Sequence, residues 1–298
     1  MSSQCVDLLP QCWQHPAMTD GVRNIPTTAE PAADRGQRAL IERARAVLSQ
    51  DDRVLGIWLS GSYGRGDSDE FSDVDLFVVT DAADVDGFCQ DWPGISDAIA
   101  PSVLRKQIPG RPVFTQVSSD WLRFDLVVGT PTDIPRRTTS TLRPLYDPSG
   151  LSSRLSPPGP PKQPDPERVA SLTQEFFRVL GLLPVVVGRG EYYVAVKGAG
   201  MALTMLGDLM LEDVAVEDRG GAMHLTRLLP ADRCQTLMDL PAIEATRESV
   251  IDAHLACAAA FVPLARDLYR RCELEWPAAM EDALRRHLDK TLAIKLPG

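Results

Sequence analysis

The stretch of the chain that decides the fold is residues 60–76, which read SGSYGRGDSDEFSDVDL. An apolar run lies on either side of it, VLGIWL at 54–59 and LFVV at 76–79, and each run predicts a strand. The glycines and serines between the runs predict a tight loop after the first strand. Side chains two residues apart in a strand point to the same face, so Asp73 and Asp75 are expected to project together towards this loop.

The two aspartates predict a site for a divalent cation. Two carboxylates held this close together repel each other unless a cation lies between them. A glycine-rich turn can present backbone N–H groups to a phosphate, and a divalent ion is suited to bind beside it. We therefore expect phosphoryl or nucleotidyl transfer, with Gly61 and Ser62 at the phosphate and Arg65 as a clamp on phosphate oxygens. The alternatives are a solvated strand end for the aspartates and a surface turn cation for Arg65.

The ordered combination of Gly61-Ser62 with Asp73-Val74-Asp75-Leu76 resembles the nucleotidyltransferase superfamily of DNA polymerase beta and kanamycin nucleotidyltransferase. The resemblance implies that the loop holds a nucleoside triphosphate and that the two aspartates bind Mg²⁺. It also implies a third catalytic and metal-binding carboxylate on a neighbouring strand. The candidate is Asp125, which lies in the apolar run 121–128. The alternative for Asp125 is a residue that faces solvent on an edge strand.

The second half of the chain adds two candidate residues through a further resemblance. A small nucleotidyltransferase domain followed by a helical bundle resembles the antibiotic adenylyltransferases, above all the lincosamide nucleotidyltransferases. The resemblance implies transfer of AMP from ATP to a hydroxyl of a small molecule, such as a lincosamide, an aminoglycoside or a natural-product intermediate. It also implies a carboxylate that activates the acceptor, at Glu191, and a cation that contacts the triphosphate, at Lys197. The alternatives are an acid stabilised by a helix N-terminus and a solvated helix charge.

The order of the predicted elements indicates an α/β (α+β) domain with a small mixed sheet, followed by an all-α helical bundle. Residues 155–166 contain six prolines and predict a semi-rigid linker. The predicted divisions are a flexible tail at 1–36, a nucleotidyltransferase domain at 37–154, this linker, and a helical domain at 167–298. Within the first domain, the segment 82–100 predicts a helix interrupted at Pro93-Gly94.

The net charge and the cysteine pattern limit the classes of partner that we expect for this protein. The net charge of −10 argues against a nucleic-acid surface, which needs clustered Lys and Arg, and it suits a small cationic acceptor. The six cysteines are scattered without a CxxC pair, so we expect reduced thiols in the cytoplasm. No run of the sequence indicates a membrane span. A homodimer is left open.

Three other interpretations of the sequence compete with this one. A bare catalytic domain of this type could modify a partner protein as an antitoxin, but this chain carries its own helical domain. A catalytically inactive nucleotide-binding regulator would lack one of the three carboxylates, and all three are present. The spacing of Arg247 and His254 also resembles the R-x6-H pattern of HEPN ribonucleases, a match that arises easily by chance.

Overall fold

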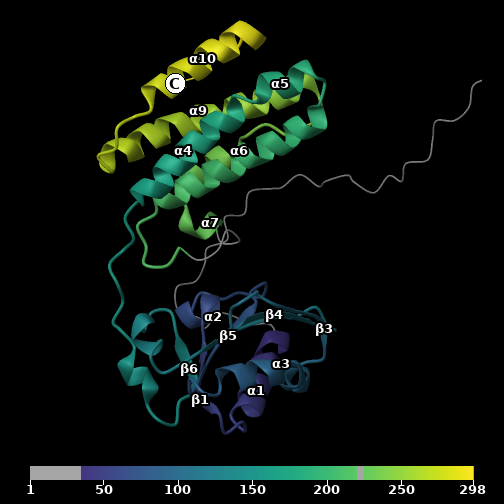
Figure 1. The fold of residues 1–298 in the computed structure, drawn as a ribbon, viewed down its shortest axis with the longest axis vertical. Helices are drawn as coiled ribbons and strands as arrows, with labels where there is room; N and C mark the ends of the chain where they lie inside the picture. The colour runs from purple at the N-terminus through teal and green to yellow at the C-terminus, as the bar shows by residue number, and fades with distance from the viewer. Residues whose placement is uncertain (1–34, 220–224, 298) are drawn as a thin grey trace, which may run out of the picture.

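The structure is a computed structural model that describes residues 35–219 and 225–297. Its elements form two bodies, a sheet with helices and a bundle of helices (Figure 1). This arrangement confirms the predicted fold class. The expected tail at 1–36 lies outside the described residues, except for Arg35 and Gly36, which begin the first helix. The limits of the two domains remain a prediction.

The first body is built on a six-stranded sheet with the order β3-β4-β5-β2-β1-β6. β2 and β5 pair in parallel, and every other neighbouring pair of strands is antiparallel. The mixed sheet therefore has β2 and β5, the strands that carry Asp75 and Asp125, at its centre. The strands are β1 (Val54–Leu59), β2 (Val74–Thr80), β3 (Ser102–Gln107), β4 (Val113–Ser118), β5 (Arg123–Gly129) and β6 (Arg143–Tyr146).

Two helices cover one face of this sheet. α1 (Arg35–Leu48) and α3 (Val85–Ile99) pack their apolar side chains, such as Leu40 and Trp92, into one buried cluster with the strands. The expected interruption of α3 at Pro93-Gly94 is wrong, because the helix continues through it. Pro93 removes one helical hydrogen bond. The burial of Phe88 and Trp92, on the part of α3 that precedes it, offsets that loss.

The other face of the sheet is covered by the segment that follows β5. A separate buried cluster joins Trp58 and Phe77 from the sheet to Ile134 and Leu142 from this segment. The segment contains two short 3₁₀ helices, η1 (Ile134–Arg136) and η2 (Leu151–Arg154). It therefore folds back over β1 and β2 near their ends, next to the predicted phosphate loop.

The second body is a helical bundle with its own buried core. Its first helix begins at Pro166, and the preceding Asp165 caps it by accepting hydrogen bonds from the backbone N–H groups of Glu167 and Arg168. The helices are α4 (Pro166–Leu180), α5 (Leu183–Gly188), α6 (Tyr192–Glu212), α7 (Leu225–Leu228), α8 (Ala231–Met238), α9 (Arg247–Arg271) and α10 (Ala278–Leu292).

Three helical stretches of the described chain are long and apolar enough to cross a membrane, by length and composition alone. They are Pro166–Gly188, Tyr192–Glu212 and Arg247–Arg271. The expectation that no run indicates a membrane span is therefore wrong on this criterion. In the structure, their buried apolar side chains make up most of the core of the bundle.

Candidate functional site

The carboxylates of Asp75 and Asp125 lie side by side on neighbouring strands. The two residues are direct partners in the parallel register of β2 and β5, and partners in register point to the same face of the sheet. Asp73 directly precedes β2, two residues before Asp75. The structure thus brings together the three aspartates that the sequence analysis singled out.

The three carboxylates act on one another electrostatically. Burial raises the pKa of Asp75 to about 6, and the charges of Asp73 and Asp125 add to this effect. Burial also raises the pKa of Asp125, against a hydrogen bond with Thr115 that lowers it, and the charge of Asp73 raises it further. The cluster therefore holds more negative charge than its surroundings neutralise.

The predicted phosphate loop is a single helical turn, α2 (Gly61–Arg65). The backbone of Gly61 has a φ of +56°, a conformation that glycine adopts without strain. A β-carbon at this position would lie 1.8 Å from Oδ2 of Asp75. Gly61 is thus required both by the turn and by the close approach of the carboxylate.

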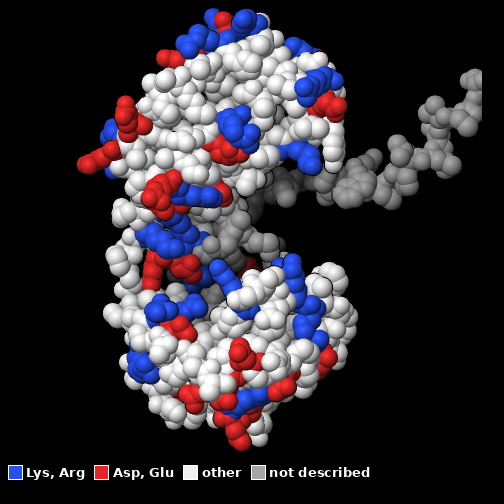
Figure 2. All heavy atoms as spheres, viewed as in Figure 1, with Lys and Arg blue, Asp and Glu red and all other residues white. Residues whose placement is uncertain are grey.

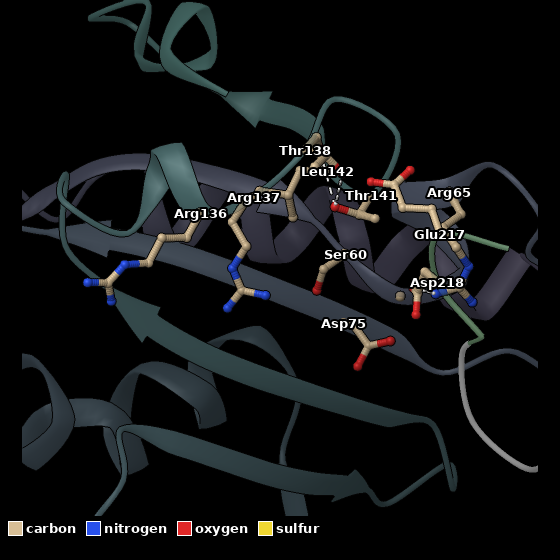
Figure 3. Close-up of a pocket in the computed structure, with 11 residues that line it drawn as sticks. Ser60, Arg65, Asp75, Arg136, Arg137, Thr138, Thr141, Leu142, Glu217 and Asp218 are labelled. Atoms are coloured by element: carbon tan, nitrogen blue, oxygen red, sulfur yellow. Dashed lines mark hydrogen bonds and ion pairs between the residues drawn. The ribbon is translucent and has the colours of Figure 1, made fainter. Parts of the chain in front are cut away.

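A cavity of about 400 Å³ opens beside Gly61 and Asp75 (Figure 3). Gly61, Arg65 and Asp75 line it, and so do Arg136 and Arg137 from the segment after β5. Figure 3 shows the side chains of Ser60 and Asp75 between those of Arg137 and Arg65. The guanidinium of Arg137 lies 5.0 Å from the centre of the Phe77 ring. A site of this kind offers carboxylates to a cation and guanidinium groups to phosphate oxygens.

Arg136 and Arg137 are site residues that the sequence analysis missed. The sequence shows them only as two adjacent arginines after the strand that carries Asp125, and their spacing does not predict that they reach this cavity. Among the described residues, Arg137 forms no ion pair within 4 Å. It is therefore the arginine of this cavity that is best placed to meet a phosphate.

Arg65 is held by two aspartates in this structure. Its guanidinium lies 3.0 Å from Asp67 and 2.8 Å from Asp218. Asp218 belongs to the segment after α6, so this ion pair joins the helical bundle to the sheet. Ser140 donates a hydrogen bond to the neighbouring Glu217 across the same junction. Figure 2 shows charged side chains of both signs where the two bodies meet.

The remaining predicted site residues do not line this cavity. The hydroxyl of Ser62 is buried and has no hydrogen-bond partner among the described residues. Glu191 is the residue before α6, and its side chain makes no capping hydrogen bond. Lys197 lies on α6 and lines a different cavity, within the helical bundle. The sequence interpretation joined Glu191 and Lys197 to the aspartates, and the structure does not bring them together.

The chemistry of the aspartate cluster fits a divalent cation, although its side chains are not gathered around a common point. Within residues 35–219 and 225–297, no group of three or more His, Cys, Asp or Glu is placed to hold a metal ion as it stands. Carboxylate oxygens are the ligands that Mg²⁺ and similar ions prefer.

The family comparison agrees with this geometry. Residues 41–100, which include α2 and Asp73 and Asp75, match the family model described as a nucleotidyltransferase domain. The chain contains a nucleotidyltransferase domain. The predicted superfamily and the predicted enzyme class are thereby confirmed. Enzymes of this family generally use a nucleoside triphosphate and a divalent metal ion. The comparison with curated proteins found no match to the chain.

Several solved structures are similar to this nucleotidyltransferase at low identity. An aminoglycoside 6-adenyltransferase from Bacillus subtilis is 13% identical, with 84% of this chain and 95% of that chain covered and a TM-score of 0.40. A nucleotidyltransferase-like protein from Exiguobacterium sibiricum 255-15 is 15% identical, with coverage of 85% and 88% and a TM-score of 0.33. The Thermotoga maritima CCA-adding enzyme complexed with tRNA is 12% identical, with coverage of 85% and 72% and a TM-score of 0.30.

Proposed function

We propose that this nucleotidyltransferase moves AMP from ATP to a hydroxyl group of a small molecule, with Mg²⁺ bound by Asp73, Asp75 and Asp125. The observation that carries the proposal is the position of Asp75, which lies beside Gly61, lines a cavity that also presents arginines, and is influenced by the charges of Asp73 and Asp125. A divalent ion held there would neutralise phosphate charge and lower the pKa of the acceptor hydroxyl.

The residues of the chain have distinct parts in the proposed reaction. Arg137 and Arg65 bind the phosphate oxygens, and Gly61 leaves room for Asp75 to face them. The acceptor oxygen forms a bond to the α-phosphorus, while the bond from this phosphorus to the bridging oxygen of pyrophosphate breaks. The hydroxyl proton passes to a carboxylate, and pyrophosphate leaves with the electron pair of the broken bond.

Asp125 is the best placed acceptor for this proton. Its carboxylate lies next to Asp75 in the strand register, and a carboxylate oxygen that is not bound to the ion can accept a proton. Glu191 was expected to serve as the base, but it lies at the start of α6 in the helical bundle, whereas Asp125 lies on the strand next to Asp75.

The proposed acceptor is a hydroxyl-bearing antibiotic, of the aminoglycoside or lincosamide class, or a biosynthetic intermediate. The net charge of −10 supports a cationic acceptor over a nucleic acid. The described cysteines, Cys89, Cys234, Cys257 and Cys272, are free thiols, which supports a cytoplasmic location. The apolar faces of the long helices are used within the bundle, which supports action away from a membrane.

The test is an assay of pyrophosphate release with Mg²⁺, each of the common nucleoside triphosphates in turn, and a panel of hydroxyl-bearing antibiotics. Mass spectrometry should show an acceptor that has gained one nucleoside monophosphate. The Asp75→Asn variant should release no pyrophosphate above background, while Asp91→Asn, on the surface of α3, should act as the wild type does. Equal release by wild type and Asp75→Asn would contradict the proposal, and modification of a protein in place of the small molecules would contradict the proposed acceptor class.

A further inference from the structure

A second cavity lies inside the helical bundle, apart from the aspartate cluster. Its volume is about 320 Å³, and all of its lining residues belong to α4, α5, α6, α9 or the turn after α4. Most of the lining is apolar, and this size falls at the lower end of the range of about 300–1,000 Å³ for small-molecule pockets. It shares no residue with the cavity that contains Asp75.

The floor of this cavity carries one hydrogen-bond acceptor, the Nε2 atom of His254. The side chain of His254 on α9 is 2% exposed. Its Nδ1 lies 2.6 Å from the carbonyl oxygen of Val250. A carbonyl can only accept, so Nδ1 carries the hydrogen and Nε2 presents a lone pair. Burial lowers the pKa of His254, which keeps the ring neutral near pH 7.

The hydrogen bond that the described residues give the ring of His254 is the one between Nδ1 and Val250, which leaves the lone pair of Nε2 to the cavity. Nε2 faces Gly198 on α6, where an added β-carbon would lie 3.3 Å away. Because residue 198 has no side chain, the imidazole edge reaches the cavity that both residues line. A lone pair at the wall of a cavity can accept a hydrogen bond, and a ligand with an N–H or O–H donor would supply one.

The cavity also carries one cation with no acidic partner in the described chain. Lys197 lines it, and its ammonium lies 5.9 Å from the centre of the Tyr193 ring. The other cation of the lining, Arg178, is occupied by both carboxylate oxygens of Glu175, at 2.7 and 2.6 Å. Lys197 is therefore the positive charge that remains available to a ligand.

Apolar side chains stand exposed around the same cavity. Tyr193 is 72% exposed, and Val194 and Met201 are each 47% exposed. Their burial against an apolar ligand would remove apolar surface from water, which favours binding. The charge, the acceptor and the apolar surface thus describe one kind of ligand.

We propose that this cavity binds a small apolar anion that carries one N–H or O–H donor. The anionic group meets Lys197, the donor meets Nε2 of His254, and the apolar body lies against Tyr193, Val194 and Met201. The inference goes beyond nucleotidyl transfer, because no residue of the aspartate cavity takes part in it.

Two fluorescent probes separate the two polar contacts. Anilinonaphthalene sulfonate has apolar rings, a sulfonate anion and one N–H donor, and phenylnaphthylamine has the rings and the N–H but no charge. Titration of each probe into the full-length protein should show saturable binding of one molecule per chain. Lys197→Met should weaken binding of the sulfonate at least fivefold and leave binding of the uncharged probe within twofold.

His254→Phe keeps a ring of similar size and removes the acceptor, so it should weaken binding of both probes at least threefold. Lys290→Met is the matched control, because it removes an exposed lysine of α10 that does not line the cavity. It should bind both probes as the wild type does. Near-ultraviolet circular dichroism confirms that each variant is folded.

The proposal is overturned if the folded wild-type protein binds neither probe, or if Lys197→Met and His254→Phe both bind as the wild type does. The second result would mean that the probes occupy other exposed apolar surface. If His254→Phe does not fold, the nitrogen resonance of Nε2 in the wild-type protein decides. It should shift on binding of phenylnaphthylamine, and no shift at saturation would overturn the contact with His254.

Discussion

The carboxylate of Asp75 occupies the space that a side chain on residue 61 would need. An added β-carbon at Gly61 would lie 1.8 Å from Oδ2 of Asp75, far inside the contact distance of the two atoms. The backbone of Gly61 is also left-handed, with a φ of +56°. The left-handed start of α2 and the position of the Asp75 carboxylate therefore both depend on glycine at residue 61.

This relationship predicts that Gly61→Ala disables the enzyme. The methyl group must displace Asp75 and strain the backbone, so pyrophosphate release should fall at least 100-fold and stability by more than about 2 kcal/mol. Gly66→Ala is a matched control, because Gly66 has a φ of +79° with nothing within 4 Å of an added β-carbon. The backbone strain that alanine adds there should lower the stability by only about 1–2 kcal/mol, and turnover should be unchanged. Similar turnover in the two variants would show that the position of Asp75 is unimportant.

The raised pKa of Asp75 predicts how stability depends on pH. The folded state holds the proton of Asp75 up to about pH 6, while the unfolded chain releases it near pH 3.8. The wild type therefore loses stability as the pH rises from about 4 to 6, by up to roughly 3 kcal/mol. Asp75→Asn removes this loss, so its melting temperature should match that of the wild type near pH 4 and exceed it at pH 7.5.

Saturating Mg²⁺ provides the control for this measurement. It should raise the melting temperature of the wild type at pH 7.5 and leave that of Asp75→Asn nearly unchanged. A constant difference between the two proteins from pH 4 to 7.5 would contradict the raised pKa.

The hydrogen bond of Thr115 to Asp125 predicts a shift in the pH dependence of turnover. This bond favours the charged carboxylate, so its loss in Thr115→Val raises the pKa of Asp125 further. If Asp125 accepts the proton, the acidic limb of the profile of kcat against pH should move to higher pH. Thr204→Val, on the exposed surface of α6, should leave the profile in place. An unmoved acidic limb in Thr115→Val would argue against Asp125 as the base.

The ion pair of Arg65 with Asp218 predicts competition with the nucleotide. Asp218 draws the guanidinium that we propose for the phosphates, so Asp218→Asn should tighten nucleotide binding. Partly exposed pairs contribute up to about 1 kcal/mol, which corresponds to roughly fivefold in affinity. Calorimetric titration of a non-hydrolysable ATP analogue measures this effect. Asp208→Asn, which breaks an exposed pair with Arg168, is the control. Weaker binding in Asp218→Asn would mean that Asp218 supports the nucleotide site.

The position of Glu191 predicts a null result. It lies outside the aspartate cavity and makes no capping hydrogen bond, so Glu191→Gln should leave turnover within about twofold of the wild type. A general base would lose about 10²–10⁴-fold. A loss of that size in a steady-state assay would restore Glu191 to the catalytic site.

The residues around the aspartates show what the sequence could predict. Asp73 and Asp75 lie within one short stretch whose spacing gives their common face, an inference from local period and turn chemistry that the sequence carries directly. Asp125 was named because the family resemblance implies a third carboxylate on a neighbouring strand, and an apolar run supplied the candidate. The roles proposed for these residues still await the experiments above.

Other parts of the site depend on how distant segments pack. Nothing in the spacing of Arg137 or Asp218 reveals that a segment after β5 and another after α6 both reach the same cavity. Glu191 and Lys197 were assigned to the aspartate site through a family resemblance. The resemblance suggested their roles but gave no information on how the helical bundle packs against the sheet. The continuity of α3 through Pro93 was missed because tertiary burial outweighed a local helix breaker.

The parallel pairing of β2 with β5 has a consequence for how the protein folds. Parallel strands cannot be joined by a hairpin, and here α3, β3 and β4 all lie between them in the chain. Such a long loop must close before Asp75 can meet Asp125, and pairings of this kind form slowly. Asp75 and Asp125 are therefore far apart in the early stages of folding. They begin to repel each other only when β2 and β5 pair and complete the sheet. Affinity for a divalent ion should appear with that last step, so the time course of metal binding during refolding would report the moment at which the central strands pair.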